Sequence, residues 1–177
     1  MSKLEKGYVH VYTGNGKGKT TAAIGLAVRA AAAGMKTYAA QFMKNFMYGE
    51  LRTLDRLYDY ITVEQFGDDG FVFKKEEPDE KLVAKIKEGL AAAKENMLSG
   101  EYDLIVLDEI CVSHYFKLVT TEEILSFIKE KPESVELILT GRYCPPEVIE
   151  AADLVTEMKE IKHYYEKGVE ARRGIES

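Results

Sequence analysis

The sequence predicts an α/β fold, a mostly parallel sheet with helices on both faces, and three observations carry this prediction. Short β-rich stretches alternate with longer stretches of helical periodicity, which is the order of strand–helix–strand units. The runs "LIVL" and "VELILT" are largely apolar, as strands buried on both faces are. The glycine-rich stretch "TGNGKGKTT" stands between the first predicted strand and the first predicted helix, where nucleotide-binding loops occur.

Length and composition indicate one cytoplasmic domain over residues 1–177. Hydrophobic residues make up 46% of the chain and charged residues 31%, an ordinary globular composition. The formal net charge of -6 argues against nucleic-acid binding by bulk electrostatics. Two cysteines, Cys111 and Cys144, are too few for a disulfide framework and fit a reducing cytosol. The N-terminal stretch lacks the apolar core of a signal peptide, and no apolar run is long enough to span a membrane.

The first predicted elements surround the glycine-rich stretch. Residues 8–12 alternate and are rich in β-forming side chains, which predicts a strand. An alanine-rich helix is expected over residues 20–33, because alanine favours a helix and Gly34 supplies a stop. Its small side chains would let the helix lie close to the sheet. A second strand is expected over residues 36–42.

The middle of the chain contains the clearest helix. A short helix over residues 49–58, a strand over 61–66 and a Gly/Asp-rich loop over 67–70 precede it. The helix itself covers residues 79–98, beginning after a proline and ending before Gly100. The positions expected to face the core recur at steps of three and four residues: Leu82, Ile86, Leu90, Ala93 and Met97.

The last third of the chain continues the alternation of strands and helices. The predicted elements are a strand over residues 104–107, a helix over 122–131, a strand over 135–140, a short helix starting at Pro145-Pro146 and a strand over 154–158. The tail from about residue 162 is polar and poorly periodic. We expect it to be loose, or to pack near a ligand or a second subunit.

The glycine-rich stretch departs in one place from the ordinary phosphate-binding motif, G-x-x-x-x-G-K-[ST]. The motif would place its first glycine where this chain has Thr13, and glycines follow at positions 14 and 16 instead. Such glycines let the backbone turn its N–H groups toward a phosphate chain, at which the following helix also aims its positive end. Lys19 would reach phosphate oxygens, and the Thr20 hydroxyl would bind Mg²⁺. The alternative is a glycine-rich turn with scattered lysines.

Two further strand ends bring charged side chains toward the same edge. "YDLIVLDEI" places Asp108 and Glu109 after an apolar run, so that Asp108 would hold the hydration shell of Mg²⁺, as in the Walker B pattern. Glu109 would orient water, a metal ligand or the ribose. "LILTGR" places Arg142 beyond another strand end, where ligands bind in open α/β sheets, and a guanidinium suits a phosphate there. The alternatives are an ordinary acidic strand end and a surface arginine in a turn.

Two other stretches stay ambiguous on residue pattern alone. Lys44 in "QFMKN" would contact an anion or be solvated. Phe71 and Phe73 in "GFVF" are two residues apart in a loop, and by pattern they are typical of a short core-facing piece.

Together these stretches resemble one family, the ATP:corrinoid adenosyltransferases. The resemblance runs in order through "GNGKGKTTAA", "QFMKN", "GFVF", "YDLIVLDE", "LILTGR", "ADLVTEM", "IKH" and the closing "GIE". The altered loop is itself the form that this family has. The resemblance implies a RecA-like P-loop fold, a homodimer, ATP with Mg²⁺ or Mn²⁺, a corrinoid substrate and a flavodoxin-like or other reductase as electron donor.

The resemblance also assigns site residues by position. Lys19, Glu109 and Arg142 would be catalytic and would lie in the ATP site, Thr20 and Asp108 would hold Mg²⁺, and the pair Phe71 and Phe73 would contact the lower face of the corrinoid. The aromatic pair is thought in the family to displace the axial base from cobalt. The nucleotide loop would comprise Gly14, Asn15, Gly16, Lys17, Gly18, Lys19, Thr20 and Thr21.

Two departures from the family pattern bear on the site. Relatives often have Trp where this chain has Phe73, so its aromatic wedge is smaller. Many relatives also carry an N-terminal segment ahead of the first strand that covers the active site, whereas this sequence starts directly before its strand. We expect this cover to be missing or to be built from elsewhere.

The expected reaction is attack of cobalt(I) on the 5′ carbon of ATP, with triphosphate as the leaving group. Because this bond lies at the α end of the triphosphate, we expect Asn15, Gly16 and Gly18 to hold the nucleotide in a shifted or reversed orientation. The alternatives are a P-loop nucleoside kinase and a non-catalytic or motor-like ATPase. Kinases of the thymidine-kinase type commonly carry a four-cysteine zinc site, for which two cysteines are too few.

Overall fold

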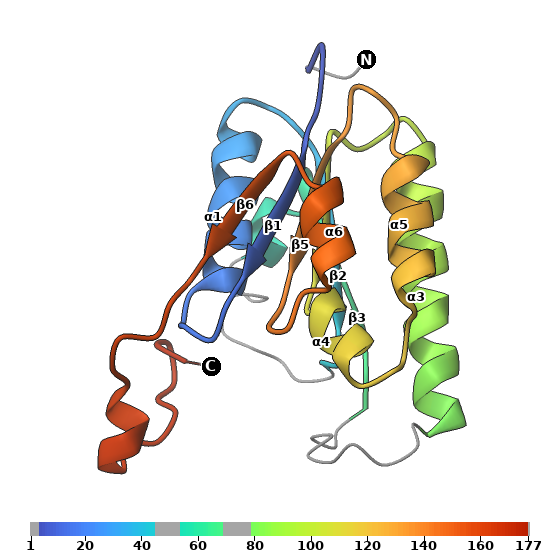
Figure 1. Cartoon of the computed structure of the whole chain (residues 1–177). Helices are drawn as coiled ribbons and strands as arrows, with labels where there is room; N and C mark the ends of the chain where they lie inside the picture. Colours follow the sequence, from blue (N-terminus) through green and yellow to red (C-terminus); the bar gives the residue numbers. More distant parts are fainter. Residues whose placement is uncertain (1–3, 45–53, 69–78, 177) are drawn as a thin grey trace.

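The computed structural model describes residues 4–44, 54–68 and 79–176, and its centre is a parallel sheet of six strands (Figure 1). Neighbouring strands lie in the order β3-β2-β4-β5-β1-β6, and every pairing is parallel. This confirms the α/β prediction, and it is consistent with a RecA-like P-loop domain. The strands are β1 (Val9–Thr13), β2 (Thr37–Phe42), β3 (Ile61–Phe66), β4 (Leu104–Asp108), β5 (Glu136–Thr140) and β6 (Leu154–Glu157).

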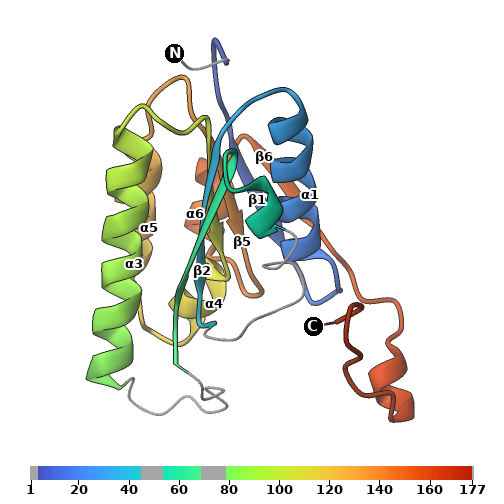
Figure 2. The same cartoon turned by 180° about the vertical axis from the view of Figure 1, so that it is seen from behind.

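Helices cover both faces of the sheet, as predicted (Figures 1 and 2). On one face lie α1 (Lys19–Ala32) and the short 3₁₀ helix η1 (Asp55–Leu57). On the other face lie α3 (Glu80–Leu98), α4 (Ile110–Tyr115), α5 (Thr121–Lys129) and α6 (Pro146–Ala151). None of the helices among these residues is both long and apolar enough to cross a membrane.

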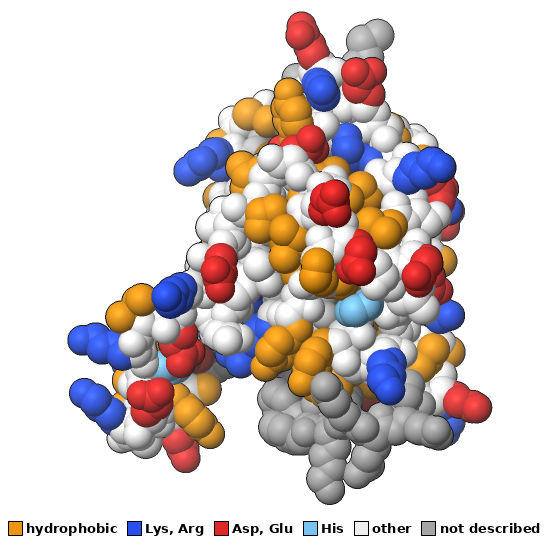
Figure 3. All heavy atoms as spheres, in the orientation of Figure 1, with side chains coloured by type: hydrophobic (Ala, Val, Ile, Leu, Met, Phe, Trp, Pro, Cys, Tyr) orange, Lys and Arg blue, Asp and Glu red, His pale blue; other side chains and the backbone are white. Residues whose placement is uncertain are grey.

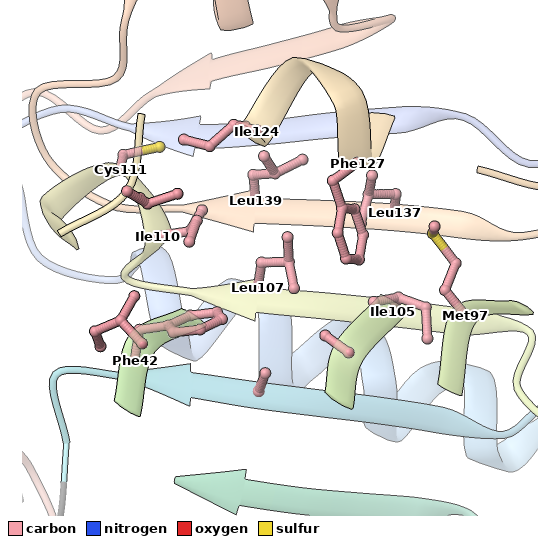
Figure 4. Packing of buried hydrophobic residues seen from close by; sticks show 14 of the residues in the cluster. Phe42, Met97, Ile105, Leu107, Ile110, Cys111, Ile124, Phe127, Leu137 and Leu139 are labelled. Carbon is pink, nitrogen blue, oxygen red and sulfur yellow. The ribbon is translucent and has the colours of Figure 1, made fainter. Parts of the chain in front are cut away.

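The two faces of the sheet bury different kinds of side chain. Toward α3 and α5 the strands present large residues, among them Leu107 and Leu139, which lie near Phe127 of α5 (Figure 4). Toward α1 they present Val106 and Ile138, which pack with the alanines of that helix. Because alanine side chains are short, α1 lies close to the sheet, and its first turn is brought up to the strand ends.

Helix α3 shows how far periodicity determined the core. Four of the five predicted positions are buried, but Leu90 is only half-buried and Gly89 takes the remaining place. A Cβ on Gly89 would lie 2.4 Å from Cγ of Phe66, so the aromatic ring of β3 fills the space that a side chain would need. Asp79 caps the helix by accepting a hydrogen bond from the backbone N–H of Lys81 at 3.1 Å.

Among the described residues, the boundaries of the predicted strands and of the other predicted helices agree with the structure to within two residues, and two short elements were missed, α4 and a 3₁₀ helix in the tail. The six-residue helix α4 starts directly after β4 and is too short to show helical periodicity in the sequence. The predicted helix over 49–58 lies mainly outside the described residues, and its described end contains η1. Met158, predicted to end the last strand, follows β6.

The C-terminal tail extends away from the edge of the sheet. After β6 the chain leaves the sheet, forms the 3₁₀ helix η2 (Tyr164–Lys167) and returns toward the turn between β1 and α1 (Figures 1 and 2). Within residues 159–176 no side chain is buried. The tail, whose sequence is polar, is therefore an exposed segment.

Candidate nucleotide-binding site

The glycine-rich loop bends around the side chain of Lys19. Gly14 and Gly18 have φ angles of 95° and 116°, which side chains larger than glycine rarely adopt. Lys19 begins α1 and is buried, and its Nζ donates hydrogen bonds to the carbonyl oxygens of Gly14 and Gly16, each at 2.8 Å. Burial lowers the pKa of this ammonium group, because the charged form has lost water. The loop thus has a cation at its centre.

Met158 explains why the loop needs glycine at two of its positions. The backbone N–H of Gly16 donates to the carbonyl oxygen of Met158 at 2.6 Å. A Cβ on Gly16 would lie 2.6 Å from that same oxygen, and a Cβ on Gly14 would lie 2.5 Å from it. Both distances are shorter than a carbon and an oxygen can approach without displacement, so the loop packs on the chain after β6 as bare backbone.

Thr13, where the ordinary motif has glycine, is the last residue of β1. It pairs with Glu157 in the neighbouring strand, and its carbonyl oxygen accepts from the N–H of Met158 at 2.8 Å. Extended strand backbone is open to any residue, so this position has no need of glycine. The turn of the loop begins one residue later, at Gly14.

Asp108, at the end of β4, is a buried carboxylate with hydrogen bonds to both of its oxygens. Oδ1 accepts from the hydroxyls of Thr20 at 2.8 Å and Thr140 at 2.7 Å. Oδ2 accepts from Nζ of Lys44 at 2.7 Å and from Nε2 of Gln41 at 3.3 Å. Side chains from the ends of β2, β5 and α1 therefore hold this carboxylate in one orientation.

The strand order explains how these groups meet. Strand β4 lies between β2 and β5, so the ends of three strands place Gln41, Asp108 and Thr140 in a row. Gln65 of β3 extends the row by donating from Nε2 to Oε1 of Gln41 at 3.0 Å. Sequence reasoning missed the threonine and both glutamines, although each is a polar residue at the carboxyl end of a predicted strand, which is the signal that could have found them.

Glu109 has an uncommon backbone conformation next to Asp108. Its φ of 63° is left-handed, and such a residue costs on the order of 1 kcal/mol or more unless its surroundings hold it. Its N–H donates to the hydroxyl of Thr140 at 2.9 Å, which fixes the turn. Burial, and then the charge of Asp108, raises the pKa of the Glu109 carboxyl. Strain and burial of a carboxyl at a strand end are features of a functional position.

Arg142 is exposed and follows β5 in a turn that is packed on α4. Gly141 has a φ of 137°, and a Cβ there would lie 2.9 Å from Cβ of Cys111. The positive charge of Arg142 lowers the pKa values of both Lys19 and Glu109, although in each case burial has the larger effect. The guanidinium is therefore within electrostatic reach of the loop lysine and the strand-end carboxyl.

The oxygen atoms at the end of β4 suit Mg²⁺. Magnesium prefers oxygen ligands and is commonly held by one carboxylate together with substrate phosphates. Thr20 and Asp108 provide a hydroxyl and a carboxylate in direct contact with each other. In the described part of the chain no group of three or more His, Cys, Asp and Glu side chains could hold a metal ion. This donor set fits an ion whose remaining ligands come from a nucleotide and water.

The predicted site residues divide into three groups. Lys19, Thr20, Asp108, Glu109 and Arg142 come together at the carboxyl ends of the strands. In the rest of the loop, Asn15 and Thr21 are exposed, and Lys17 points to the C-terminal tail. The pair predicted to contact the corrinoid, Phe71 and Phe73, lies outside the described residues.

Comparisons with known proteins agree with the resemblance seen in the sequence. Residues 5–177 match the family model described as ATP:corrinoid adenosyltransferase BtuR/CobO/CobP. A corrinoid adenosyltransferase from Sinorhizobium sp is 34% identical, with 97% of this chain and 81% of that protein covered. One from Escherichia coli K12 is also 34% identical, covering 97% and 86%. Corrinoid adenosyltransferase CobA of Salmonella typhimurium is 32% identical, covering 99% and 88%.

Proposed function

Since the chain belongs to the ATP:corrinoid adenosyltransferase family, we propose that it transfers the adenosyl group of ATP at the carboxyl edge of its sheet. Adenosyl transfer from ATP to a corrinoid is its activity, and what we propose are the residues that perform it. The observation that carries the proposal is that Thr20 of the loop shares a hydrogen bond with the buried Asp108. This contact supports a single site in which the loop would bind phosphate and Asp108 would bind the metal ion.

In the proposed reaction a Co–C bond forms and the bond between the 5′ carbon and the α-phosphate oxygen breaks. The cobalt(I) electron pair makes the new bond, and the old bonding pair leaves on tripolyphosphate. Lys19 would exchange its two carbonyl partners for phosphate oxygens, and Arg142 would approach the phosphates from the turn after β5. Both cations would stabilise the negative charge that grows on the leaving group.

We assign Mg²⁺ to Thr20 and Asp108, with phosphate oxygens completing its shell; the ion would supply positive charge to the triphosphate. Lys44 already neutralises the Asp108 carboxylate at 2.7 Å, so this lysine would have to share the carboxylate with the ion. Glu109, which is held in its strained turn by Thr140, would orient the nucleotide. Thr20, Asp108, Lys44 and Glu109 would thus serve the ATP site. The corrinoid would be bound by other parts of the chain.

The loop geometry supports a shifted or reversed nucleotide. The turn begins at Gly14 because Thr13 belongs to β1, and Gly16 is bonded to Met158. We propose that Asn15, Gly16 and Gly18 place the loop N–H groups so that the 5′ carbon faces outward, where a large corrinoid can reach it. A loop that served a kinase would instead hold the β- and γ-phosphates around the bond to be broken.

We further propose that the chain is one domain that acts as a cytoplasmic homodimer and receives electrons from a flavodoxin-like or other reductase. The corrinoid contacts of Phe71 and Phe73 remain predictions from the sequence. Exposed apolar side chains along β6 and in the tail support a homodimer: Leu154, Val155, Ile161 and Tyr165. Hydrophobic side chains gather on the face that carries β6 and α6 (Figure 3).

Phosphorus NMR combined with a visible spectrum tests the proposed reaction. Chemically reduced cob(I)alamin, ATP, Mg²⁺ and protein should give a photolabile alkylcobalt species and one intact tripolyphosphate for each adenosyl group transferred. Stoichiometric ADP and phosphate without alkylcobalt would instead support a kinase or an ATPase. A structure with ATP lying in the ordinary direction along the loop would contradict the orientation proposal alone.

A further inference from the structure

The C-terminal tail is attached to the glycine-rich loop by a network of polar side chains. Nζ of Lys17 donates to Oε1 of Glu176 at 2.8 Å and to the hydroxyl of Tyr164 at 3.3 Å. Lys17 lies between Gly16 and Gly18 in the glycine-rich loop, while Glu176 is close to the end of the chain. The hydrogen bond between Lys17 and Glu176 places Glu176 beside the turn between β1 and α1, toward which the tail returns (Figures 1 and 2).

Arg172 orients the carboxylate that Lys17 contacts. Its backbone N–H donates to Oε2 of Glu176 at 2.8 Å, and its Nη2 donates to Oε1 at 3.2 Å. Nη2 also donates to the hydroxyl of Tyr164 at 3.2 Å, and that hydroxyl donates to Glu176. The guanidinium carbon lies 5.0 Å from the centre of the Tyr164 ring. Glu176 and Tyr164 therefore bridge a lysine of the loop and an arginine of the tail.

Few interactions other than this network fix the position of the tail. No side chain in residues 159–176 is buried, so apolar packing within the chain contributes little to the position of the tail. The Glu176 side chain is nevertheless only 15% exposed, compared with 44% for Lys17, because its neighbours in the network surround it. Hydrogen bonds from Arg172, and next from Lys17, lower the pKa of its carboxyl.

We propose that Glu176 and Tyr164 are positioning residues of the ATP site, which hold Lys17 of the loop and Arg172 of the tail beside the triphosphate. This inference rests on the proposed function, because it assumes that the loop binds the triphosphate. The network contains two cations and one carboxylate, so its net charge beside the glycine-rich loop is positive. The C-terminal segment thereby becomes part of the nucleotide site, although it is remote from the loop in sequence.

Calorimetric binding of Mg-tripolyphosphate tests the proposal without any corrinoid chemistry. Glu176→Ala and Tyr164→Phe should each weaken binding, by about threefold, the scale expected of an exposed ion pair or hydrogen bond. Tyr164→Phe matters because it removes the bridging hydroxyl without changing charge. If the carboxylate of Glu176 acted only by repelling phosphate, Glu176→Ala would tighten binding and Tyr164→Phe would leave it unchanged, and the proposal would be wrong.

A double-mutant cycle shows whether Glu176 acts through Lys17. Lys17→Met should weaken tripolyphosphate binding, and adding Glu176→Ala to it should cost clearly less than in the wild-type background. Independent, additive losses would contradict the positioning role. Glu130→Ala is the matched control, because it removes another exposed pair, Lys94–Glu130 at 2.6 Å, between α3 and α5, and it should leave binding unchanged.

Steady-state kinetics separate this inference from the proposed function. Glu176→Ala should raise KM for ATP by the same factor of about three and leave KM for the corrinoid unchanged. Wild-type protein that binds tripolyphosphate but transfers no adenosyl group would contradict the proposed function and leave the network testable by binding. Normal transfer with an unchanged KM for ATP in both variants would contradict the positioning role alone.

Discussion

Lys19 is the residue on which the glycine-rich loop closes. Its ammonium group is buried and holds two loop carbonyls, and this position suits an exchange of partners when phosphate arrives. We expect Lys19→Ala to lower kcat/KM by about tenfold to a hundredfold or more, because a charge-assisted contact to the leaving group is lost. Circular dichroism and thermal unfolding should show an intact fold. Near-normal turnover would exclude this lysine from the mechanism.

We expect the charged carboxylate of Glu109 to be needed for activity and to destabilise the folded protein, by an amount that depends on pH. Folding raises its pKa, so folding favours the protonated form; the stability from this group is present below the unfolded pKa and is lost as pH rises through the folded pKa. Glu109→Gln keeps the shape without the charge. We expect it to lose activity, yet to unfold at a higher urea concentration than the wild type, with a difference that grows with rising pH across that window.

Glu122 provides the control for the pH experiment. Its carboxyl is at the start of α5, where hydrogen bonds from backbone N–H and from Thr120 lower its pKa. The charged form is therefore favoured by folding, and Glu122→Gln should not stabilise the protein at neutral pH. If the two variants changed the urea unfolding midpoint equally at each pH, the folded state would not disfavour the charged form of Glu109.

At the scale of elements, the loop and the chain after β6 act as one unit. Gly16 has no room for a Cβ against Met158, whereas Gly25 in α1 has no atom within 4 Å of an added Cβ. We expect Gly16→Ala to displace the loop and to weaken ATP binding at least tenfold while the sheet stays folded. Gly25→Ala should keep ATP binding and stabilise the fold by about 0.5–1 kcal/mol, because alanine favours a helix. Isothermal titration and urea unfolding measure the two effects.

The sequence predicted those parts of the site that each strand carries by itself. Asp108 and Glu109 end an apolar run, Arg142 follows another, and the loop carries its own motif, so local pattern was sufficient. Thr140 shows the local signal of a polar residue at a strand end, but its contact with Asp108 could not be predicted, because it depends on β5 lying beside β4. Chain order does not reveal which parallel strands are neighbours.

At the scale of the whole molecule, long-range pairs were the part that sequence reasoning could not supply. Lys17 and Glu176 lie near opposite ends of the chain, and nothing in the periodicity of either stretch predicts their contact. The tail was expected to be loose or to pack near a ligand or a second subunit, and the structure shows it at the glycine-rich loop. A polar segment is placed by specific partners, which composition does not identify.

The open edge of the sheet carries the last prediction, which concerns assembly. Among the described residues, strand β6 has a neighbouring strand on one side only, and its side chains Leu154 and Val155 are 43% and 41% exposed, with Ile161 of the tail at 82%. Because burying apolar surface favours association, we expect light scattering to give twice the 19.9 kDa chain mass.

Leu154→Glu combined with Ile161→Glu should shift the protein to the monomer, since two charges would then have to be desolvated at the interface. The control is Leu98→Glu, which changes an apolar side chain at the end of α3 that is 52% exposed and should leave the dimer intact. A wild-type protein that runs at the mass of one chain at micromolar concentration would contradict the homodimer. Dissociation by Leu98→Glu but not by the double variant would place the interface on the other side of the molecule.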